Sequence, residues 1–241
     1  MPRAYVERTY RQRADSGLAP FSVVVEQTDL LVSAETNLEA ETRASVQRHR
    51  RALERCIGEH PEFATSLTPL SLSRSEPLLA EMLRASAVCN VGPMAAVAGA
   101  IAEFVGRDLL RFSPQVLVEN GGDLFVATHE ERVLSIFAGE SPLSERLGLK
   151  IPAAAQPLGV CTSSGTVGPS LSFGRADAAT VVARSAAFAD AAATALANRI
   201  HEAADIEPAL EMAQQLEGLA GVVLIKGDRL GAWGAVELVR L

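Results

Sequence analysis

Short apolar runs separated by polar turn residues open and close the chain. Residues 21–26 and 30–34 form two such runs, the first rich in β-branched residues, with a polar turn at 27–29 between them. Residues 221–226 and 230–241 repeat this arrangement at the C-terminal end. Apolar runs of this length on either side of a short turn predict a β-hairpin at each end of the chain.

The strongest hairpin signal lies in the middle of the chain, at Asn120, Gly121 and Gly122. Apolar residues flank these three positions, and Asn-Gly supplies the positive φ values that tight hairpin turns need. We expect the hairpin strands at residues 116–118 and 123–127. A third strand is expected to extend this hairpin into a meander, and two more to follow; these cover residues 133–138, 158–162 and 178–183.

Five segments have the composition and boundaries of helices. Asn37 is suited to cap the first of them, whose sparse apolar positions predict a surface helix. Pro93 is suited to the first turn of the third, because its missing N–H is not needed there. Small apolar residues after Pro93 indicate burial against a sheet. The helices are expected over residues 37–57, 76–87, 93–110, 185–202 and 208–219, with a loop at 66–75.

Strand pairs that alternate with helices and are joined by short turns predict an α+β fold. Such a fold has antiparallel sheet meanders with helices packed on one side of the sheet. The 241 residues are enough for a large core, and no segment has the composition of a linker. We therefore expect a single domain over residues 1–241.

The charge balance limits the partners of the protein. Its formal net charge is −7, whereas nucleic-acid binding rests largely on Lys and Arg that neutralise phosphates. Residues 43–55 contain five arginines, but Glu39 and Glu41 precede them and Glu54 lies among them, and we interpret this segment as a solvated helix face. We expect a small-molecule ligand and no nucleic acid. The sequence leaves the oligomeric state open, with a homodimer as one alternative.

Neither the cysteines nor the apolar segments indicate export or a membrane. Cys56, Cys89 and Cys161 are odd in number and widely spaced, so we expect reduced core thiols. The first residues contain no apolar signal segment, and the apolar run at 91–102 is too short to span a bilayer. The expected location is the cytoplasm.

The most informative polar pair is Asp190 and Thr194 on the alanine-rich helix. Residues four apart lie on the same face of a helix, so this carboxylate and hydroxyl could converge on one hard cation. Thr194 could equally bond back to the carbonyl of Asp190, as helical threonines commonly do. Spacing alone leaves both interpretations open.

Three further segments could contact a ligand. The Asn120, Gly121 and Gly122 turn allows close backbone approach, although a hairpin turn needs these residues anyway. Unpaired N–H groups after Gly92 would favour a phosphate at the start of the third helix. Small hydroxyls after a strand suit phosphate or ribose contacts, but they also suit any strand end; they belong to Thr162, Ser163 and Ser164, followed by Gly165.

The histidines lie outside all of these segments. His49, His60, His129 and His201 occupy polar or loop-like stretches, so no Ser-His-Asp or Cys-His arrangement has an evident base. We do not expect nucleophilic hydrolysis.

The order of these motifs resembles that of the flavin transferases of the ApbE superfamily. Those enzymes have a Gly-Gly hairpin, a Thr-Ser-Gly loop and an Ala-Asp-x-x-x-Thr helix in this order. The resemblance implies an ApbE-like, T-fold-related domain in which Asp190 and Thr194 help to hold magnesium beside a flavin, FAD or FMN. It also implies a ligand pocket formed by Gly121, Gly122, Thr162, Ser163, Ser164 and Gly165.

Three patterns resemble more specifically an uncharacterised conserved bacterial and archaeal family placed beside the flavin transferases. They are Arg8-Thr9-Tyr10-Arg11 near the N-terminus, Phe21 with Thr28-Asp29-Leu30, and the segment from Val91 to Glu103. One departure concerns the reaction: flavin transferases follow their Thr-Ser-Gly loop with His-Ile-x-Asp-Pro, whereas residues 170–177 here contain neither His nor Pro. Arg175 in this stretch could still hold a phosphate through its fixed donor fork.

We therefore expect an ApbE-like protein that binds a flavin-like or other nucleotide ligand with a divalent cation, magnesium, bridging its phosphates. Asp177 or Asp123 could serve as acid or base. Two alternatives stay open: an enzyme acting on a pterin- or purine-like ligand, and a non-catalytic binding or assembly protein in which Asp190 and Thr194 are structural.

Overall fold

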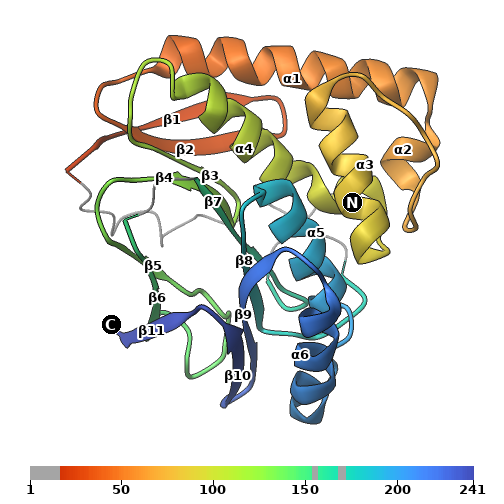
Figure 1. Ribbon diagram of the computed structural model, residues 1–241, viewed down its shortest axis with the longest axis vertical. Coiled ribbons are helices and arrows are strands. Elements are labelled where there is room, and N and C mark those ends of the chain that lie inside the picture. The colour runs from red at the N-terminus through yellow and green to blue at the C-terminus, as the bar shows by residue number, and fades with distance from the viewer. Residues whose placement is uncertain (1–16, 154–156, 168–171) are drawn as a thin grey trace.

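The computed structural model describes residues 17–153, 157–167 and 172–241. Eight antiparallel strands form one large sheet, in the order β1-β2-β3-β4-β7-β8-β9-β10, and three form a small sheet, β11-β6-β5 (Figure 1). The strands are β1 Ala19–Val25, β2 Thr28–Ala34, β3 Val116–Asn120, β4 Asp123–Ala127, β5 Arg132–Ser135, β6 Leu147–Ile151, β7 Leu158–Ser163, β8 Ala178–Ala183, β9 Leu219–Lys226, β10 Arg229–Gly234 and β11 Glu237–Arg240.

Helices lie on one side of the large sheet (Figure 1). Strand residues such as Phe125 and Val181 point into the core that these helices share with the sheet. Their neighbours Val126 and Val182 point to the opposite face, into a second core against the small sheet. The helices are α1 Glu39–Glu59, α2 Glu62–Thr65, α3 Pro77–Cys89, the 3-10 helix η2 Pro93–Ala96, α4 Val97–Leu109, α5 Ala186–Ala197, η3 Ala203–Asp205 and α6 Ile206–Gln215.

The predicted α+β architecture with antiparallel meanders is confirmed. The central hairpin forms between β3 and β4, with φ of 74° at Gly121 and 129° at Gly122, values that other residues rarely adopt. The strand predicted at residues 178–183 is found with the same bounds as β8. The loop predicted at residues 66–75 is also confirmed.

Several boundaries differ from the expectation. The first turn lies at Glu26 and Gln27, because Glu26 takes up a φ of 52° and Thr28 already pairs with Val25. The helix expected over 185–202 ends at Ala197. The last predicted helix ends at Gln215, so that Leu219 begins β9.

The small sheet was not predicted. Residues 133–138 were expected to extend the central meander, but β5 pairs with β6, a strand that the sequence analysis missed. The predicted C-terminal strand, 230–241, divides after Gly234, and its second part pairs with β6 instead of β9. Gly234 has a φ of 85°, which bends the chain from one sheet to the other. Helices therefore cover one face of the large sheet and strands cover the other.

Cys56, Cys89 and Cys161 are buried free thiols, as predicted. No single helix in the described part of the chain is long and apolar enough to cross a membrane, although the bent pair of Pro77–Cys89 and Pro93–Leu109 meets the length and composition requirement together. The N-terminal Arg8 pattern lies outside the described residues.

Helices α4 and α5 cap each other. Glu103, in the middle of α4, accepts hydrogen bonds from the N–H groups of Ala186 (2.7 Å) and Ala187 (3.3 Å) at the start of α5. Asp190, one turn into α5, accepts from the N–H of Gly99 near the start of α4 at 2.9 Å. A carboxylate at a helix N-terminus satisfies unpaired N–H groups and complements the helix dipole.

The two helices approach so closely that Gly99 is required between them. A Cβ at this position would lie 2.2 Å from the carbonyl oxygen of Ala186 and 2.8 Å from the Cβ of Asp190. The reciprocal caps thus join two segments that are about ninety residues apart in the sequence.

We expect Glu103→Ala to lower the free energy of unfolding by about 2–3 kcal/mol, because it removes a cap and leaves buried N–H groups unpaired. Urea unfolding at neutral pH measures this loss. Glu39→Ala is the matched control. Glu103 pairs with Arg107 four residues on, and Glu39 pairs in the same way with Arg43, but Glu39 is half exposed, so its removal should cost less than about 0.5 kcal/mol. Equal effects of the two substitutions would contradict the capping role.

Candidate functional site

The start of α4 holds the carboxylate of Asp190 in a buried position. Only 8% of this residue is exposed. Burial raises the pKa of Asp190 to about 7, against the opposing effect of hydrogen bonds from the Gly99 and Ala98 N–H groups. A phosphate was predicted at the N–H groups directly after Gly92, where the structure has the 3-10 helix η2. The Ala98 and Gly99 N–H groups, at the start of α4, hold the chain's own carboxylate.

Asp123 lies at the first position of β4, directly after the Gly121-Gly122 turn, and is 9% exposed. Its Oδ1 is buried and has no hydrogen-bond partner among the described residues. Burial and the negative charge of Asp190 raise the pKa of Asp123 well above its usual range. Asp123 and Asp190 therefore lie close together in a buried position, called the acidic centre below, where their negative charges would repel each other.

The Cys161 thiol is the third group at this centre. Cys161 lies opposite Asp123 in the β4–β7 pairing, and its Sγ donates to the carbonyl oxygen of Ala186 at 3.2 Å. Burial and the charges of Asp123 and Asp190 raise the pKa of the thiol. Because the thiolate is the nucleophilic form, this environment does not activate Cys161.

Backbone and amide contacts hold the hairpin turn against these groups. The Asn120 side chain donates from Nδ2 to the carbonyl oxygen of Ala98 at 3.1 Å, which fixes the turn to the start of α4. The Thr162 N–H donates to the carbonyl oxygen of Gly122 at 3.1 Å. The structure thus brings Asn120, Gly122 and Thr162, three of the predicted ligand contacts, to the acidic centre.

The side chains of residues 162–164 and the backbone of Gly165 make mainly local contacts. The Thr162 hydroxyl lies 2.9 Å from that of Thr180, while Ser163 is half-buried at the end of β7. The Ser164 hydroxyl accepts from two N–H groups of its own loop, at Thr166 and Val167. Gly165 passes close to another backbone, since a Cβ there would lie 2.2 Å from the carbonyl oxygen of Gly174.

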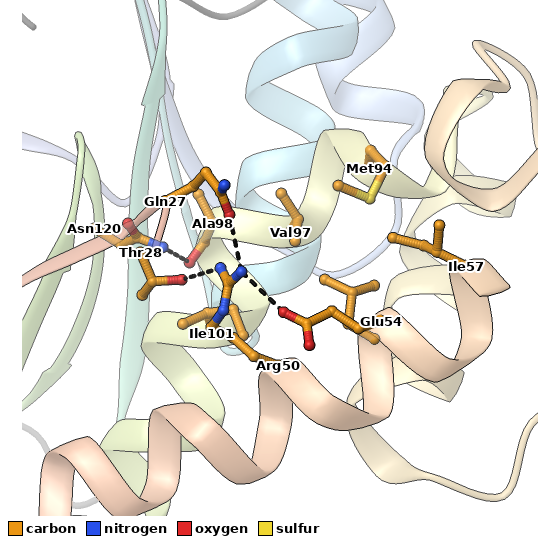
Figure 2. A pocket seen from close by; sticks show the side chains of 11 residues that line it. Gln27, Thr28, Arg50, Glu54, Ile57, Met94, Val97, Ala98, Ile101 and Asn120 are labelled. Carbon is orange, nitrogen blue, oxygen red and sulfur yellow. Dashed lines mark hydrogen bonds and ion pairs between the residues drawn. The ribbon is translucent and has the colours of Figure 1, made fainter. Parts of the chain in front are cut away.

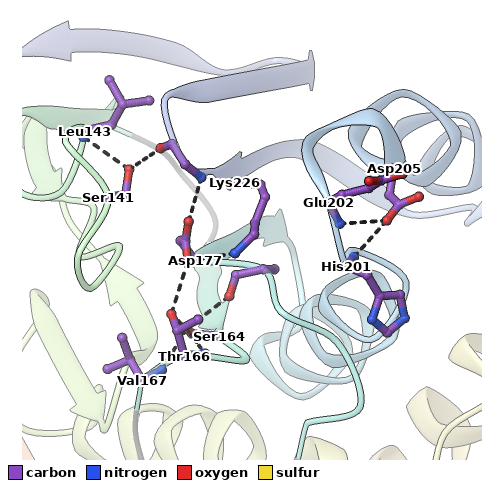
Figure 3. Close-up of polar contacts among 12 residues, drawn as sticks. Ser141, Leu143, Ser164, Thr166, Val167, Asp177, His201, Glu202, Asp205 and Lys226 are labelled. Carbon is purple, nitrogen blue, oxygen red and sulfur yellow. Dashed lines mark hydrogen bonds and ion pairs between the residues drawn. The ribbon is translucent and has the colours of Figure 1, made fainter.

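Asp177 belongs to a second polar network, shown in Figure 3. Its Oδ2 accepts from the Gly227 N–H at 2.7 Å, and its Oδ1 accepts from Lys226 Nζ at 3.4 Å and from the Thr166 hydroxyl at 3.3 Å. Asp177 therefore ties the loop after β7 to the β9–β10 turn. These contacts give it a structural role, in contrast to the unpaired oxygen of Asp123.

The remaining predicted residues lie in different surroundings. Thr194 is half-buried one turn after Asp190 on α5. Arg175 is exposed, and its N–H donates to the carbonyl oxygen of Ile200. Gly92 packs against the loop before α3, where a Cβ would lie 1.8 Å from the Ser66 carbonyl oxygen. Close packing alone explains a glycine at this position.

A cavity of about 380 Å³ beside the acidic centre was missed by the sequence analysis (Figure 2). It includes Arg50, from the segment interpreted as a solvated face. That interpretation fits Arg48, whose side chain is 59% exposed, but is wrong for Arg50, which is 15% exposed. Apolar Leu53 and Ile57 follow Arg50 at helical spacing and line the same cavity, a sequence signal for its burial.

The antiparallel sheet with helices on one face defines an ApbE-like protein. The chain superposes on the ApbE protein from Thermotoga maritima with a TM-score of 0.55 and 12% identity, over 89% of this chain and 96% of that one. The apo flavinyl transferase ApbE from Pseudomonas stutzeri gives a TM-score of 0.52 and 14% identity, over 90% and 93%. At such identities the likeness establishes the fold.

The chain belongs to the family described as AbpE bacteria, whose model matches residues 11–230. Its relatives include a UPF0280 protein from Methanopyrus kandleri, 41% identical over 221 residues, which are 88% of this chain and 89% of the relative. Another is a UPF0280 protein from Methanococcus aeolicus, 40% identical over 198 residues and 80% of each chain. The resemblance found in the sequence is thereby confirmed.

The raised pKa values of Asp123 and Asp190 predict a pH-dependent stability. The folded protein holds protons on these carboxyls where the unfolded chain has lost them, so its stability should fall as the pH rises from about 4 to about 7. Asp123→Asn removes one of the two charges. The substitution changes the free energy of unfolding at each pH, and this change should be about 1–2 kcal/mol more favourable to the folded state at pH 8 than at pH 5.

Urea unfolding at both pH values measures this difference. Asp228→Asn, at an 81% exposed side chain, is the control and should leave the pH dependence unchanged. If Asp123→Asn destabilises the protein as much at pH 8 as at pH 5, or more, the Asp123 carboxylate is favourably paired and the prediction is wrong.

Proposed function

We propose that this protein binds a flavin-like or other nucleotide ligand together with a divalent cation at the centre formed by Asp123 and Asp190. The observation that carries the proposal is the buried Asp123 Oδ1, which has no hydrogen-bond donor among the described residues and lies beside a second carboxylate. A bound cation would neutralise the repulsion between the two groups and occupy the unpaired oxygen.

The donor set fits magnesium shared with a phosphorylated ligand. Carboxylate and hydroxyl oxygens are hard ligands, and Thr194 adds a hydroxyl one turn from Asp190. Within residues 17–153, 157–167 and 172–241, no three His, Cys, Asp or Glu side chains are grouped to hold a metal alone. Magnesium is usually held by one or two carboxylates plus substrate phosphates and waters, so two acidic ligands are consistent with such a site.

Each residue at the centre has a distinct task in this proposal. Asp190 would hold the cation while anchoring the start of α4, and Asp123 would contribute its unpaired oxygen. Where Asp190 alone holds the cation, Asp123 is the group better suited to accept or donate a proton, because Asp177 is held by Lys226 and Gly227. A cation bound there would neutralise charge on the ligand phosphates.

We expect Asp190→Asn to abolish the stabilisation that magnesium and FAD give together, because the cation loses a charged ligand. The amide oxygen of Asn can still accept from the Gly99 N–H, so the fold should be retained. Thermal unfolding with and without magnesium and FAD measures the effect, and Asp228→Asn is the exposed control. An unchanged magnesium response in Asp190→Asn would exclude this cation site.

We further expect binding without transfer of FMN from FAD to a Thr- or Ser-containing acceptor peptide. Residues 173–177 supply no imidazole, and Asp177 is committed to Lys226 and Gly227, whereas the exposed Arg175 can retain a phosphate. Arg175→Ala should therefore weaken FAD retention about tenfold, and Arg229→Ala, at a 75% exposed side chain, should not. Covalent flavin on the peptide, seen by in-gel fluorescence, would contradict this expectation and show that the protein transfers FMN.

A further inference from the structure

The cavity beside the acidic centre has apolar walls and polar groups at its rim. It lies between α1, the β1–β2 turn and the first turns of α4 (Figure 2). Its volume, about 380 Å³, falls in the range of small-molecule pockets. The apolar walls come from α1, η2 and α4 and consist of Leu53, Ile57, Met94, Val97, Ala98 and Ile101.

Arg50 places a guanidinium at the rim of this cavity. Its Nη1 donates to the Thr28 hydroxyl at 3.1 Å, and its Nη2 donates to Gln27 Oε1 at 2.8 Å and to Glu54 Oε1 at 2.9 Å. These contacts fix the plane of the guanidinium, which has five N–H donors. Among the described residues, the Nε–H and the second Nη1 hydrogen have no acceptor.

Two amides complete the polar rim. Gln27 uses its Oε1 for Arg50, which leaves its amide N–H groups as donors next to the guanidinium. Asn120 uses its Nδ2 for the Ala98 carbonyl, which leaves its Oδ1 as an acceptor. Figure 2 shows both amides on the same side of the cavity as the Arg50 guanidinium. The cavity thus offers donors and an acceptor along one edge and apolar surface elsewhere.

We propose that this cavity binds a flat, fused heteroaromatic ring and that Arg50 recognises the pyrimidinone edge of that ring. A ring carbonyl would accept from Arg50 and Gln27, and the adjacent ring N–H would donate to Asn120 Oδ1. Val97 and Ile101 would contact the ring. Flavins, pterins and guanine-type purines all have this edge, a ring carbonyl next to a ring N–H.

A phosphate fits the Arg50 end of the cavity less well. Arg50 is already paired with the carboxylate of Glu54, and apolar residues would surround the phosphate on its other sides. The anionic part of a ligand is better placed at the acidic centre with its cation. This division of one ligand between two adjoining subsites rests on the proposed function, which places the phosphates and the cation at Asp123 and Asp190.

Ala98 joins the two subsites. Its N–H contributes to holding the Asp190 carboxylate, and its carbonyl accepts from Asn120 at the rim of the cavity. A ring in the cavity and phosphates at Asp190 would therefore lie on the two sides of a single residue of α4.

Binding of three phosphate-free probes, riboflavin, pterin and guanosine, tests this inference without magnesium. Isothermal titration or fluorescence quenching should detect at least one of them, and the one that binds identifies the ring. Arg50→Met should weaken that binding about tenfold or more, because a buried polar edge loses its donors. Arg51→Met, at the exposed neighbouring arginine, is the matched control and should bind like the unmodified protein.

Val97→Phe tests the cavity without changing Arg50. The larger side chain fills the space beside α4, so ring binding should be lost while the thermal unfolding midpoint shows that the protein is folded. The inference is wrong if no probe binds, or if the affinity is the same in both Arg50→Met and Val97→Phe. Magnesium with inorganic pyrophosphate tests the acidic centre separately: failure there with Arg50-dependent ring binding would remove the proposed cation site and leave the ring subsite.

Discussion

The reciprocal capping of α4 and α5 is the interaction on which the rest of the structure depends. Each helix begins where the other presents a buried carboxylate, Glu103 to Ala186 and Asp190 to Gly99. Removing either carboxylate leaves buried N–H groups unpaired, so neither helix can shift along the other without loss of hydrogen bonds. Because α4 packs on β3 and β4 and α5 packs on β7 and β8, this pair fixes both halves of the large sheet in one register.

The same interaction positions the acidic centre. Asp190 serves the fold through one oxygen, and this contact also holds its carboxylate close enough to Asp123 to raise the pKa of that group. A carboxylate that only capped a helix would be stabilised by its N–H donors, and its pKa would fall. Here burial outweighs the donors, since the pKa of Asp190 is raised to about 7. The fold therefore stores electrostatic repulsion that a cation would relieve.

The fold could be predicted from the sequence wherever local signals decide it. Gly121 and Gly122 specify their turn through backbone conformation, and β8 is apolar except for Thr180 because both of its faces are buried. The small sheet was missed because β6 is only five residues long and pairs with residues nearly ninety positions away. The acidic centre was partly foreseen: Asp190 and Asp123 were named separately, but only tertiary packing brings them together. The burial of Arg50 had a local signal in Leu53 and Ile57, which the neighbouring exposed arginines obscured.

The two polar networks of the site differ in what they leave free for a ligand. At the acidic centre, Asp123 keeps an unpaired oxygen, so this part of the site has unused capacity for a ligand. After β7, the polar side chains already have hydrogen-bond partners within the chain. Asp177 accepts from Lys226 and Gly227, and the Ser164 hydroxyl accepts from an N–H of its own loop. Of the two networks, the acidic centre is therefore the one with a polar atom still free to contact a ligand. The α4–α5 pair keeps the acidic centre in place through the Asp190 contact, whereas the loop after β7 is held by hydrogen bonds to Asp177 and Ser164.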